Sequence, residues 1–333
     1  MSFLNFTPAA GPSALGHRAG LSEIAHGGGS RGLPADRSLG AADAIVPMGD
    51  AWGKPVLHGR GGIFETCANA ECRTGWLHLW RNRARPLFEG QWCCSQECTT
   101  ALVHQAVARE MNARAELPQA HRHRVPIGLL LLDQGWITAS QLRRALEAQR
   151  EAAGGRLGGW LMRLFGIREG LITRALALQW NVPVLHLDGF LPSRMVRVLP
   201  RLFVDAYGAL PLRIAGGRIL YLAFEERIDP ILALALERMS GLKVECGILS
   251  GSDFQVAHKK LLSAEYPRAQ LLEAADEASL SKAFARQIER SRAVDARLIR
   301  VHDCLWLRIR KGRASAVSPE AQMIEDGIAS INL

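Results

Sequence analysis

Four cysteines in two pairs have a spacing that could bind a metal ion. Four residues separate Cys67 from Cys72, three separate Cys94 from Cys98, and 21 residues lie between the pairs. Thiolates in paired knuckles of this spacing are common ligands of structural zinc. Cys93 is an alternative to Cys94, but the WCCSQEC context favours Cys94, whose partner would then lie at the start of a helix. We therefore expect Zn²⁺ bound by Cys67, Cys72, Cys94 and Cys98.

The alternative for these cysteines is a set of free or disulfide-linked thiols. The chain start, MSFLNFTP, lacks the basic and apolar stretches of a signal peptide, and Asp133 interrupts the most apolar run. We therefore expect a cytoplasmic protein without a transmembrane segment, and a reducing compartment disfavours disulfides. The aromatic residues that could pack around the metal in so small a module are Trp76, Trp80, Phe88 and Trp92.

A degenerate repeat of 24 residues follows, in which residues 126–149 recur as residues 156–179. The offset is 30 residues. Two copies are too few for a solenoid, so the pair indicates two similar half-sites for a pseudo-symmetric ligand or partner. The identical pairs are Gly128/Gly158, Leu131/Leu161, Ile137/Ile167, Arg144/Arg174, Ala145/Ala175, Leu146/Leu176 and Gln149/Gln179.

Each copy has the pattern of a helix–turn–helix unit. Pro126 suits a first helical turn, where a missing N–H is tolerated, and the apolar run after it ends at Gly135. Thr138 and Gln141 have the spacing of a capping box at the start of the second helix. The helical spacing of Leu142, Ala145, Leu146 and Gln149 recurs in copy two. The alternative is a four-helix scaffold whose glycines only form turns.

The segment after the repeat has the pattern of a small α/β unit. Asp229 followed by Pro230 is a helix start signal, and Gly216 with Gly217 indicates a hairpin. We predict strands at 182–187, 210–214, 218–224 and 243–249, and helices at 229–238 and 253–262.

Together with the repeat, this segment resembles the MshEN domain found at the N-terminus of type II secretion and type IV pilus assembly ATPases. The resemblance covers residues 124–262. The matching pieces are RLG at 156–158, the xALxxQ end of each copy, VPVLHLD at 182–188, LPRLFVDAYGALPLRIAGGRILYLAF at 199–224 and SGLKVE at 240–245.

Many members of that family bind cyclic di-GMP through the two motifs, so the resemblance implies this ligand. Arginines and helix N-termini would meet its phosphates, glycines would allow close approach, and apolar side chains would support the bases. The implied contacts are Ile127, Gly128, Leu131, Gly135, Ile137 and Gln149 in copy one, and Arg156, Leu157, Gly158, Leu161, Ile167 and Gln179 in copy two.

Two departures from the family pattern bear on that ligand. Pro126 replaces the leading arginine of copy one, and Arg124, two residues earlier, is the candidate substitute. Phe165 stands where copy two should have its middle glycine, and Gly166 follows it. Loss of one charge-assisted contact would weaken binding by about 1.5–3 kcal/mol, or roughly ten- to a hundred-fold.

The sequence contains no pattern for enzyme chemistry. A phosphate-binding loop of the Walker type needs GxxxxGK[ST], whereas Lys54 is followed by Pro55. The GxSxG and HExxH patterns are absent as well. We therefore predict a non-enzymatic regulatory or docking protein of a type II secretion or type IV pilus-like system, whose components are the expected partners.

A nucleic-acid-binding protein is the alternative function. Lys and Arg number 41 against 32 Asp and Glu, a net charge of +9, and a zinc module with interleaved Trp and Arg could bind phosphates and stack on bases. The charge is spread along the chain, however, which argues against this alternative. The basic clusters are Arg81, Arg83 and Arg85; His121, Arg122, His123 and Arg124; and Arg308, Arg310, Lys311 and Arg313.

The predicted fold class is α+β: a helical tandem-repeat half followed by a small α/β half, with an upstream zinc-binding module and a disordered N-terminus. At 333 residues and 48% hydrophobic, the chain is long enough for two domains with tails. We predict a disordered, Gly/Ala/Pro-rich tail at 1–60, the zinc-knuckle module at 61–116, the MshEN-like domain at 121–264 (repeats at 121–181, α/β half at 182–264), and a C-terminal segment at 265–333 comprising a helix at 267–292, a strand pair within 293–311 and a loose tail at 314–333.

Overall fold

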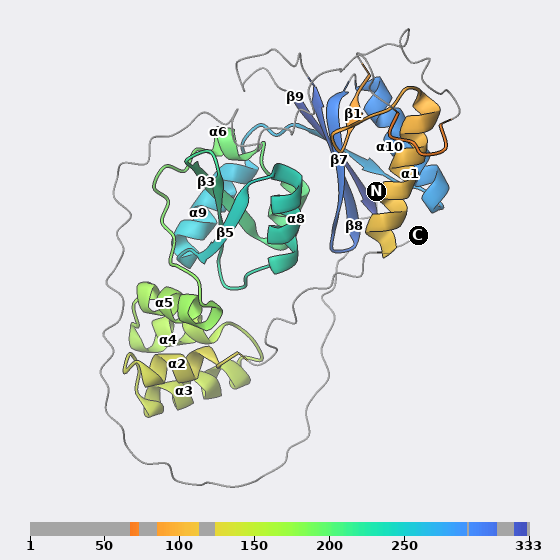
Figure 1. Cartoon of the computed structure of the whole chain (residues 1–333). Helices are drawn as coiled ribbons and strands as arrows, with labels where there is room; N and C mark the ends of the chain where they lie inside the picture. Colours follow the sequence, from red (N-terminus) through yellow and green to blue (C-terminus); the bar gives the residue numbers. More distant parts are fainter. Residues whose placement is uncertain (1–66, 73–84, 113–123, 292, 312–322, 332–333) are drawn as a thin grey trace, which may run out of the picture. The chain divides into compact units, whose positions relative to one another are not determined.

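The computed structural model describes residues 67–72, 85–112, 124–291, 293–311 and 323–331 (Figure 1). These residues belong to one compact unit, Asp43–Leu333. They form helices and two β-sheets, which confirms the α+β class. The predicted disordered tail lies outside the described residues. None of the described helices has the length and apolar character that crossing a membrane requires.

The elements are named in chain order. The described helices are α1 (Gln96–Asn112), α2 (Ile127–Asp133), α3 (Ala139–Glu151), α4 (Leu157–Phe165), α5 (Glu169–Trp180), α6 (Pro192–Met195), α7 (Arg201–Tyr207), α8 (Pro230–Ser240), α9 (Gly251–Leu262) and α10 (Glu277–Arg290). The described strands are β1 (Leu87–Phe88), β2 (Gln91–Trp92), β3 (Ala209–Ala215), β4 (Ile219–Phe224), β5 (Lys243–Ile248), β6 (Arg268–Leu272), β7 (Ala293–Val301), β8 (Cys304–Lys311) and β9 (Met323–Ser330).

Each repeat copy forms two helices, as predicted. The capping box of α3 is confirmed, because the Thr138 hydroxyl accepts from the Gln141 N–H at 3.2 Å while the Gln141 side chain accepts from the Thr138 N–H at 2.8 Å. The turns after α2 and α4 contain Gly135 and Gly166, with left-handed φ angles of 66° and 63°. Gly166 comes one position later in its copy, so α4 is longer than α2 and the displaced glycine still forms the turn.

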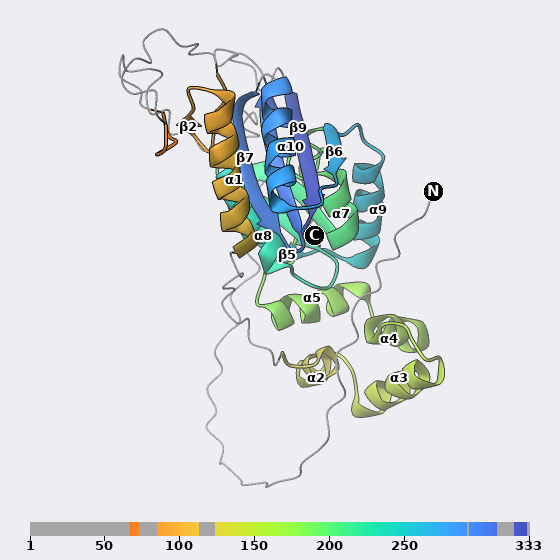
Figure 2. The ribbon, with the colours of Figure 1, turned by 90° about the vertical axis from the view of Figure 1, so that its right-hand side faces the viewer.

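The four repeat helices pair mainly between the copies. α2 lies against α5, and α3 lies against α4 (Figure 2). Neither copy therefore buries its apolar face alone, and the two fold as one unit. The buried residues of their shared core are Leu131, Ile137, Ala145, Leu161, Ile172 and Ala175.

The α/β half contains a three-stranded sheet in the order β3-β4-β5. β3 and β4 are antiparallel and are joined at the predicted turn, where Gly216 and Gly217 have φ angles of 55° and 66°. β5 runs parallel to β4. The predicted start of α8 is confirmed, because an Asp229 carboxylate oxygen accepts two backbone N–H bonds of its first turn at 3.0 Å.

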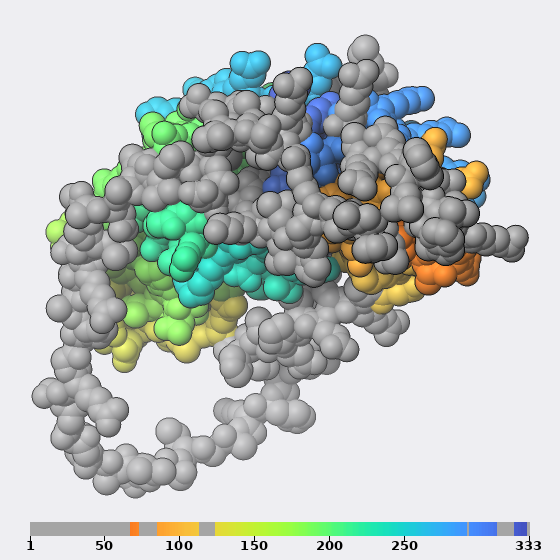
Figure 3. Space-filling model, turned by 45° about the horizontal axis from the view of Figure 1, so that its top comes forward, coloured from red at the N-terminus to blue at the C-terminus, as the bar shows by residue number. Residues whose placement is uncertain are grey.

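A second sheet joins segments from both ends of the described chain, in the order β2-β1-β7-β8-β9-β6. The hairpin β1–β2 enters through parallel pairing of β1 with β7. α1 and α10 lie side by side over one face (Figure 2), and the orange and blue surfaces adjoin in Figure 3. The sequence did not indicate this association of the cysteine-rich segment with the C-terminal segment. The domain boundaries themselves stay predictions.

The second sheet is buried on both faces, because alternate side chains of β7 and β8 point to opposite sides. Leu298, Leu305 and Leu307 pack in the cluster formed with α1 and α10. Ile299 and Trp306 pack instead in the larger core of the α/β half. The confirmed strand pair β7–β8 is therefore the layer between two hydrophobic cores.

The predicted strand at 182–187 is wrong. Only one isolated bridge forms there, between Val184 and Ile248. Pro183 explains the interruption, because it has no N–H to donate to a ladder.

Two predictions for the C-terminal segment are also wrong. The helix predicted at 267–292 starts only at Glu277, after an Asp276 cap that accepts from the Ser279 N–H. The residues before that cap form β6, which pairs with β9. The tail predicted to be loose contains β9 itself, which lies between β8 and β6. Pairing with strands distant in sequence, rather than a local pattern, decides that both segments form strands.

A buried ion pair connects the second sheet to the α/β half. Arg308 on β8 and Asp326 on β9 are direct cross-strand neighbours, and both side chains are almost fully buried. The Arg308 guanidinium donates to both Asp326 oxygens, at 2.7 and 2.9 Å. It also donates to the carbonyls of Arg197 and Val198 at 2.9 and 2.8 Å, and the Trp306 indole donates to Asp326 at 2.9 Å.

Candidate functional site

The last residue of each repeat copy binds the backbone just before the first residue of the other copy. The Gln149 amide donates to the carbonyl of Gly155 at 2.7 Å, and the Gln179 amide donates to the carbonyl of Val125 at 2.7 Å. Both the glutamines and their acceptors are equivalent positions, 30 residues apart. Two matched hydrogen bonds therefore close the repeat with an approximate two-fold pattern.

Gly128 and Gly158 are buried where the second helix of each copy meets the first. A Cβ on Gly128 would lie 2.7 Å from Leu142 Cδ1, and a Cβ on Gly158 would lie 2.7 Å from Ile172 Cγ2. Leu142 and Ile172 are equivalent positions as well. The contact that requires glycine here is therefore with a neighbouring helix.

Gly158→Ala should lower the free energy of unfolding by about 1–3 kcal/mol, as overpacking does. The β-branched Ile172 is stiff and its Cγ2 cannot move away easily, whereas Leu142 can, so Gly128→Ala should cost less. Gly159→Ala is the matched control, because nothing lies within 4 Å of its Cβ position, and it should stabilise the helix by roughly 0.5–1 kcal/mol. Urea unfolding followed by circular dichroism measures the difference, and equal effects at 158 and 159 would contradict this packing.

The six apolar motif residues divide into two groups. Leu131, Leu161 and Ile137 are 0%, 0% and 4% exposed and pack inside the helical core. The half-buried residues are Ile127, Leu157 and Ile167. Only this second group presents apolar surface to a ligand in the described conformation.

Arg156 precedes α4 and reaches into the α/β half. Its guanidinium lies 2.6 Å from a Glu225 carboxylate oxygen and 3.1 Å from a Glu226 carboxylate oxygen. Burial raises the pKa of Glu226, an effect that the charge of Arg156 opposes. Arg156, the leading arginine that copy two keeps, is thus paired with two carboxylates, although its side chain is 59% exposed.

Arg124, the candidate substitute in copy one, is held on an aromatic face. Its guanidinium carbon lies 3.0 Å from the centre of the Trp180 ring. Desolvation lowers the pKa of Arg124, and the positive charge of Arg227 lowers it further. The Trp180 indole donates to the Glu226 carbonyl at 2.8 Å, so the ring itself is fixed to the loop after β4.

Sequence reasoning missed the side chains that surround the two arginines. Trp180 directly follows the last motif glutamine, while Glu225, Glu226 and Arg227 lie between β4 and α8. No spacing rule links that loop to the repeat, because the two meet only in the folded chain. The net charge of a ligand site beside the two arginines depends on the side chains of this loop as well as on those of the repeat.

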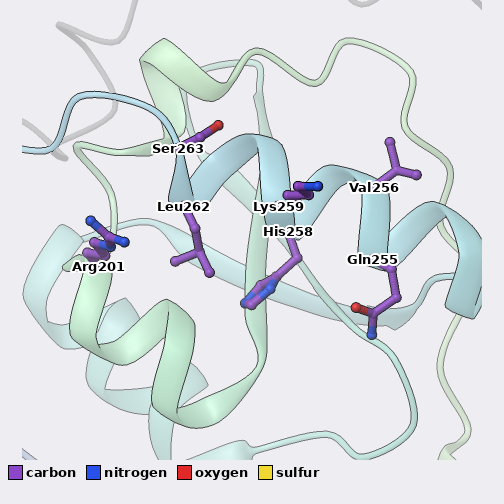
Figure 4. Close-up of a pocket in the computed structure, with 7 residues that line it drawn as sticks. All are labelled: Arg201, Gln255, Val256, His258, Lys259, Leu262 and Ser263. Carbon is purple, nitrogen blue, oxygen red and sulfur yellow. The ribbon is translucent and has the colours of Figure 1, made fainter.

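A surface hollow elsewhere holds none of the predicted ligand-binding residues. Figure 4 shows it along α9 and the start of α7. Its lining residues are Arg201, Gln255, Val256, His258, Lys259, Leu262 and Ser263.

The structure brings the four predicted metal ligands together. The Sγ atoms of Cys67, Cys72, Cys94 and Cys98 all lie within 4.8 Å of one another, and Cys94 lies 3.5 Å from Cys72 and 3.7 Å from Cys98. Four sulfurs bound tetrahedrally to zinc would be about 3.8 Å apart. Cys93 is not in the cluster, and burial raises the pKa of its thiol to about 11.

Hydrogen bonds to the sulfurs fit the same donor set. The Cys94 N–H donates to Cys67 Sγ and the Asn69 amide donates to Cys98 Sγ, both at 3.5 Å. Such donors stabilise thiolate charge around a metal. The loop that contains Cys67 and Cys72, the bend after β2 with Cys94, and the first turn of α1 with Cys98 supply the four sulfurs. The chemistry of the site therefore suits a structural zinc ion.

The basic cluster near the C-terminus is not a free phosphate-binding surface in its described part. Arg308 is buried against Asp326, and Arg310 and Lys311 are paired with Asp295 and Glu325. In the upstream cluster, Arg85 is paired with Glu289. Arg81, Arg83 and Arg313 of these clusters, with Trp76 and Trp80, lie outside the described residues.

Comparison with known proteins gives partial matches, and no family model matches the chain. Over 120 residues it is 34% identical to bacteriophage adsorption protein B of Escherichia coli K12, covering 36% of this chain and 16% of that protein. Over 202 residues it is 23% identical to the type IV pilus assembly ATPase PilB of Myxococcus xanthus, covering 58% and 35%. The structure of MshE with cdg matches at 26% identity, covering 41% of this chain and 99% of that one, with a TM-score of 0.35.

The chain therefore spans about a sixth of the first relative and about a third of the second. Sequence identity to the pilus assembly ATPase adds to the ordered motif pieces, the closed two-copy repeat and the α/β half that follows it. The middle of this chain thus resembles the MshEN domain, the N-terminal domain type of type II secretion and type IV pilus assembly ATPases.

Proposed function

We propose that this protein is a non-enzymatic, cytoplasmic regulatory or docking component of a type II secretion or type IV pilus-like system, and that its repeat binds cyclic di-GMP. The observation that carries the proposal is the matched closure of the repeat by Gln149 and Gln179. This pattern presents equivalent backbone and side-chain groups to the two halves of a two-fold symmetric dinucleotide. The pilus assembly ATPase among the relatives supports the choice of system.

The residues proposed to contact the ligand have distinct roles. Arg156 and Arg124 would meet the phosphates through charge-assisted hydrogen bonds. The half-buried Ile127, Leu157 and Ile167 would support the guanine rings. The buried motif residues, including Gly128, Gly158 and Leu161, would hold the helices at the spacing that this contact needs.

Titration of the full chain with cyclic di-GMP at high micromolar concentration is the direct test. We expect binding heat by calorimetry and chemical-shift changes confined to the repeat and the loop after β4. If neither appears, the domain is a docking scaffold that has kept the fold without the ligand.

Arg156→Ala should weaken cyclic di-GMP binding at least about ten-fold, the lower end of what a charge-assisted phosphate contact supplies. The fold should be retained, because an ion pair this exposed contributes little to stability. Arg143→Ala on the exposed face of α3 removes the same charge and serves as the control. Dissociation constants that are equal for the two variants would remove Arg156 from the site.

The four-cysteine cluster is proposed to hold one structural zinc ion. Three observations support this proposal: the four thiol ligands, the distances between their sulfurs, and the N–H groups that donate to them. When bound, zinc would stabilise the loop, the β1–β2 hairpin and the start of α1, which are too small to form a large hydrophobic core of their own.

A further inference from the structure

The two halves of the repeat differ in charge because one loop faces both of them. Glu225 and Glu226, which follow β4, pair with Arg156 of copy two. The next residue, Arg227, directly follows the Glu226 carbonyl that accepts from the Trp180 indole, and Arg124, just before copy one, stacks on that same ring. The positive charge of Arg227 accordingly lowers the pKa of Arg124. The same three-residue loop therefore neutralises one half-site and adds a cation to the other.

The position of Arg124 is fixed from two sides. Its guanidinium stacks on Trp180, with 3.0 Å between the guanidinium carbon and the ring centre. The Gln179 amide donates a hydrogen bond to the neighbouring Val125 carbonyl at 2.7 Å. The Trp180 indole donates a hydrogen bond to the Glu226 carbonyl at 2.8 Å. Stacking occupies the face of a guanidinium and leaves its N–H donors at the edge for an acceptor.

These two arginines differ from Arg156 in their pairing. No described carboxylate forms an ion pair with Arg124 or Arg227, and Arg227 is exposed. Two neighbouring like charges repel each other, and an anion between them removes that repulsion while it accepts hydrogen bonds from both.

We propose that Arg227 and Arg124, the latter held on Trp180, form an anion-binding corner that receives a phosphate group of the nucleotide ligand. This inference rests on the proposed function of the repeat. The corner supplies to copy one the charge that Pro126 removes from its motif, and its second cation comes from outside the repeat. Binding is therefore asymmetric, with the Arg124–Arg227 corner contributing more than the already paired Arg156.

Arg227→Gln tests the corner, and Arg218→Gln is the matched control, because Arg218 is an exposed arginine in the β3–β4 turn. The full chain is titrated with cyclic di-GMP and separately with GMP, which carries one phosphate. Calorimetry gives the dissociation constants, and the Trp180 indole N–H resonance, assigned with Trp180→Phe, reports on the corner. We expect Arg227→Gln to weaken cyclic di-GMP binding at least ten-fold, Arg218→Gln to change it less than two-fold, and Arg227→Lys to restore part of the loss.

The possible results separate this inference from the proposed function. If the unmodified chain binds cyclic di-GMP and Arg227→Gln binds as Arg218→Gln does, the corner is wrong and the proposed function stands. If cyclic di-GMP does not bind but GMP shifts the Trp180 resonance in the unmodified chain and not in Arg227→Gln, the corner stands and the proposed ligand is wrong. If neither nucleotide binds or shifts the resonance, both are overturned.

Discussion

Cys72→Ser should reduce the zinc content of the purified protein from about one ion per chain to near zero. Cys72 is one of four sulfurs within 4.8 Å of one another, and three remaining thiolates bind zinc much less tightly than a closed tetrahedral set. Binding of a structural zinc ion supplies folding free energy directly, on the order of 10 kcal/mol in small zinc modules. Elemental analysis of protein purified under reducing conditions measures the change.

The effect should extend beyond the cysteine-rich loop. α1 carries Cys98 in its first turn and packs on α10, and β1 pairs with β7. Loss of the metal should therefore increase hydrogen exchange in α1, in the β1–β2 hairpin and in the part of β7 that pairs with β1. The repeat helices α2–α5 should remain protected.

Cys93→Ser provides the control for the zinc prediction. Cys93 is adjacent to a proposed ligand, but its sulfur is not part of the cluster, so the variant should keep its zinc. Zinc loss from Cys93→Ser with retention in Cys94→Ser would exchange the roles of these two residues. Metal-free wild-type protein would overturn the zinc site as a whole.

Asp326→Ala should lower the free energy of unfolding by about 3–5 kcal/mol, the usual effect of removing one partner of a buried ion pair. The Arg308 side chain is 1% exposed and would remain buried without the carboxylate that it contacts with two of its nitrogens. The Trp306 indole would lose its acceptor as well. Denaturant unfolding followed by tryptophan fluorescence measures the loss.

A double variant distinguishes an unpaired charge from lost packing. Arg308→Met with Asp326→Leu replaces the pair by apolar side chains of similar size, so it should recover much of the stability that Asp326→Ala loses. The recovery should be incomplete, because the carbonyls of Arg197 and Val198 lose their donor. If Asp326→Ala changes the free energy of unfolding by less than about 1 kcal/mol, the pair does not hold the two halves together.

Features that depend on near neighbours in the chain were predictable from the sequence. The capping box of Thr138 and Gln141, the Asp229 cap and the Gly216–Gly217 turn each involve residues within a few positions of one another. Local hydrogen bonds and backbone preferences decide these features, so their residue types are sufficient signals. The metal site was predictable in part for the same reason, because the two cysteines within each pair are close in the sequence.

Two strands that depend on distant partners were not predicted. Residues 314–333 have no strong local pattern, yet they contain β9, which is held by β8 and β6. The 268–272 segment has apolar residues that fit a helix, but pairing with β9 makes it a strand. A strand obtains its hydrogen bonds from other segments, so its sequence alone does not show that it has partners.

The candidate site shows the same division. The repeat, its matched glutamines and glycines, the four cysteines and the loss of an arginine at Pro126 can all be identified from the sequence. The pairing of Glu225 and Glu226 with Arg156, and the nearness of Arg227 to the Trp180 ring on which Arg124 stacks, arise only in the folded chain. Electrostatic interactions depend on distance in space and on burial. Arg156 and Glu225 are 69 positions apart in the chain, and nothing in the sequence shows that they are close in space.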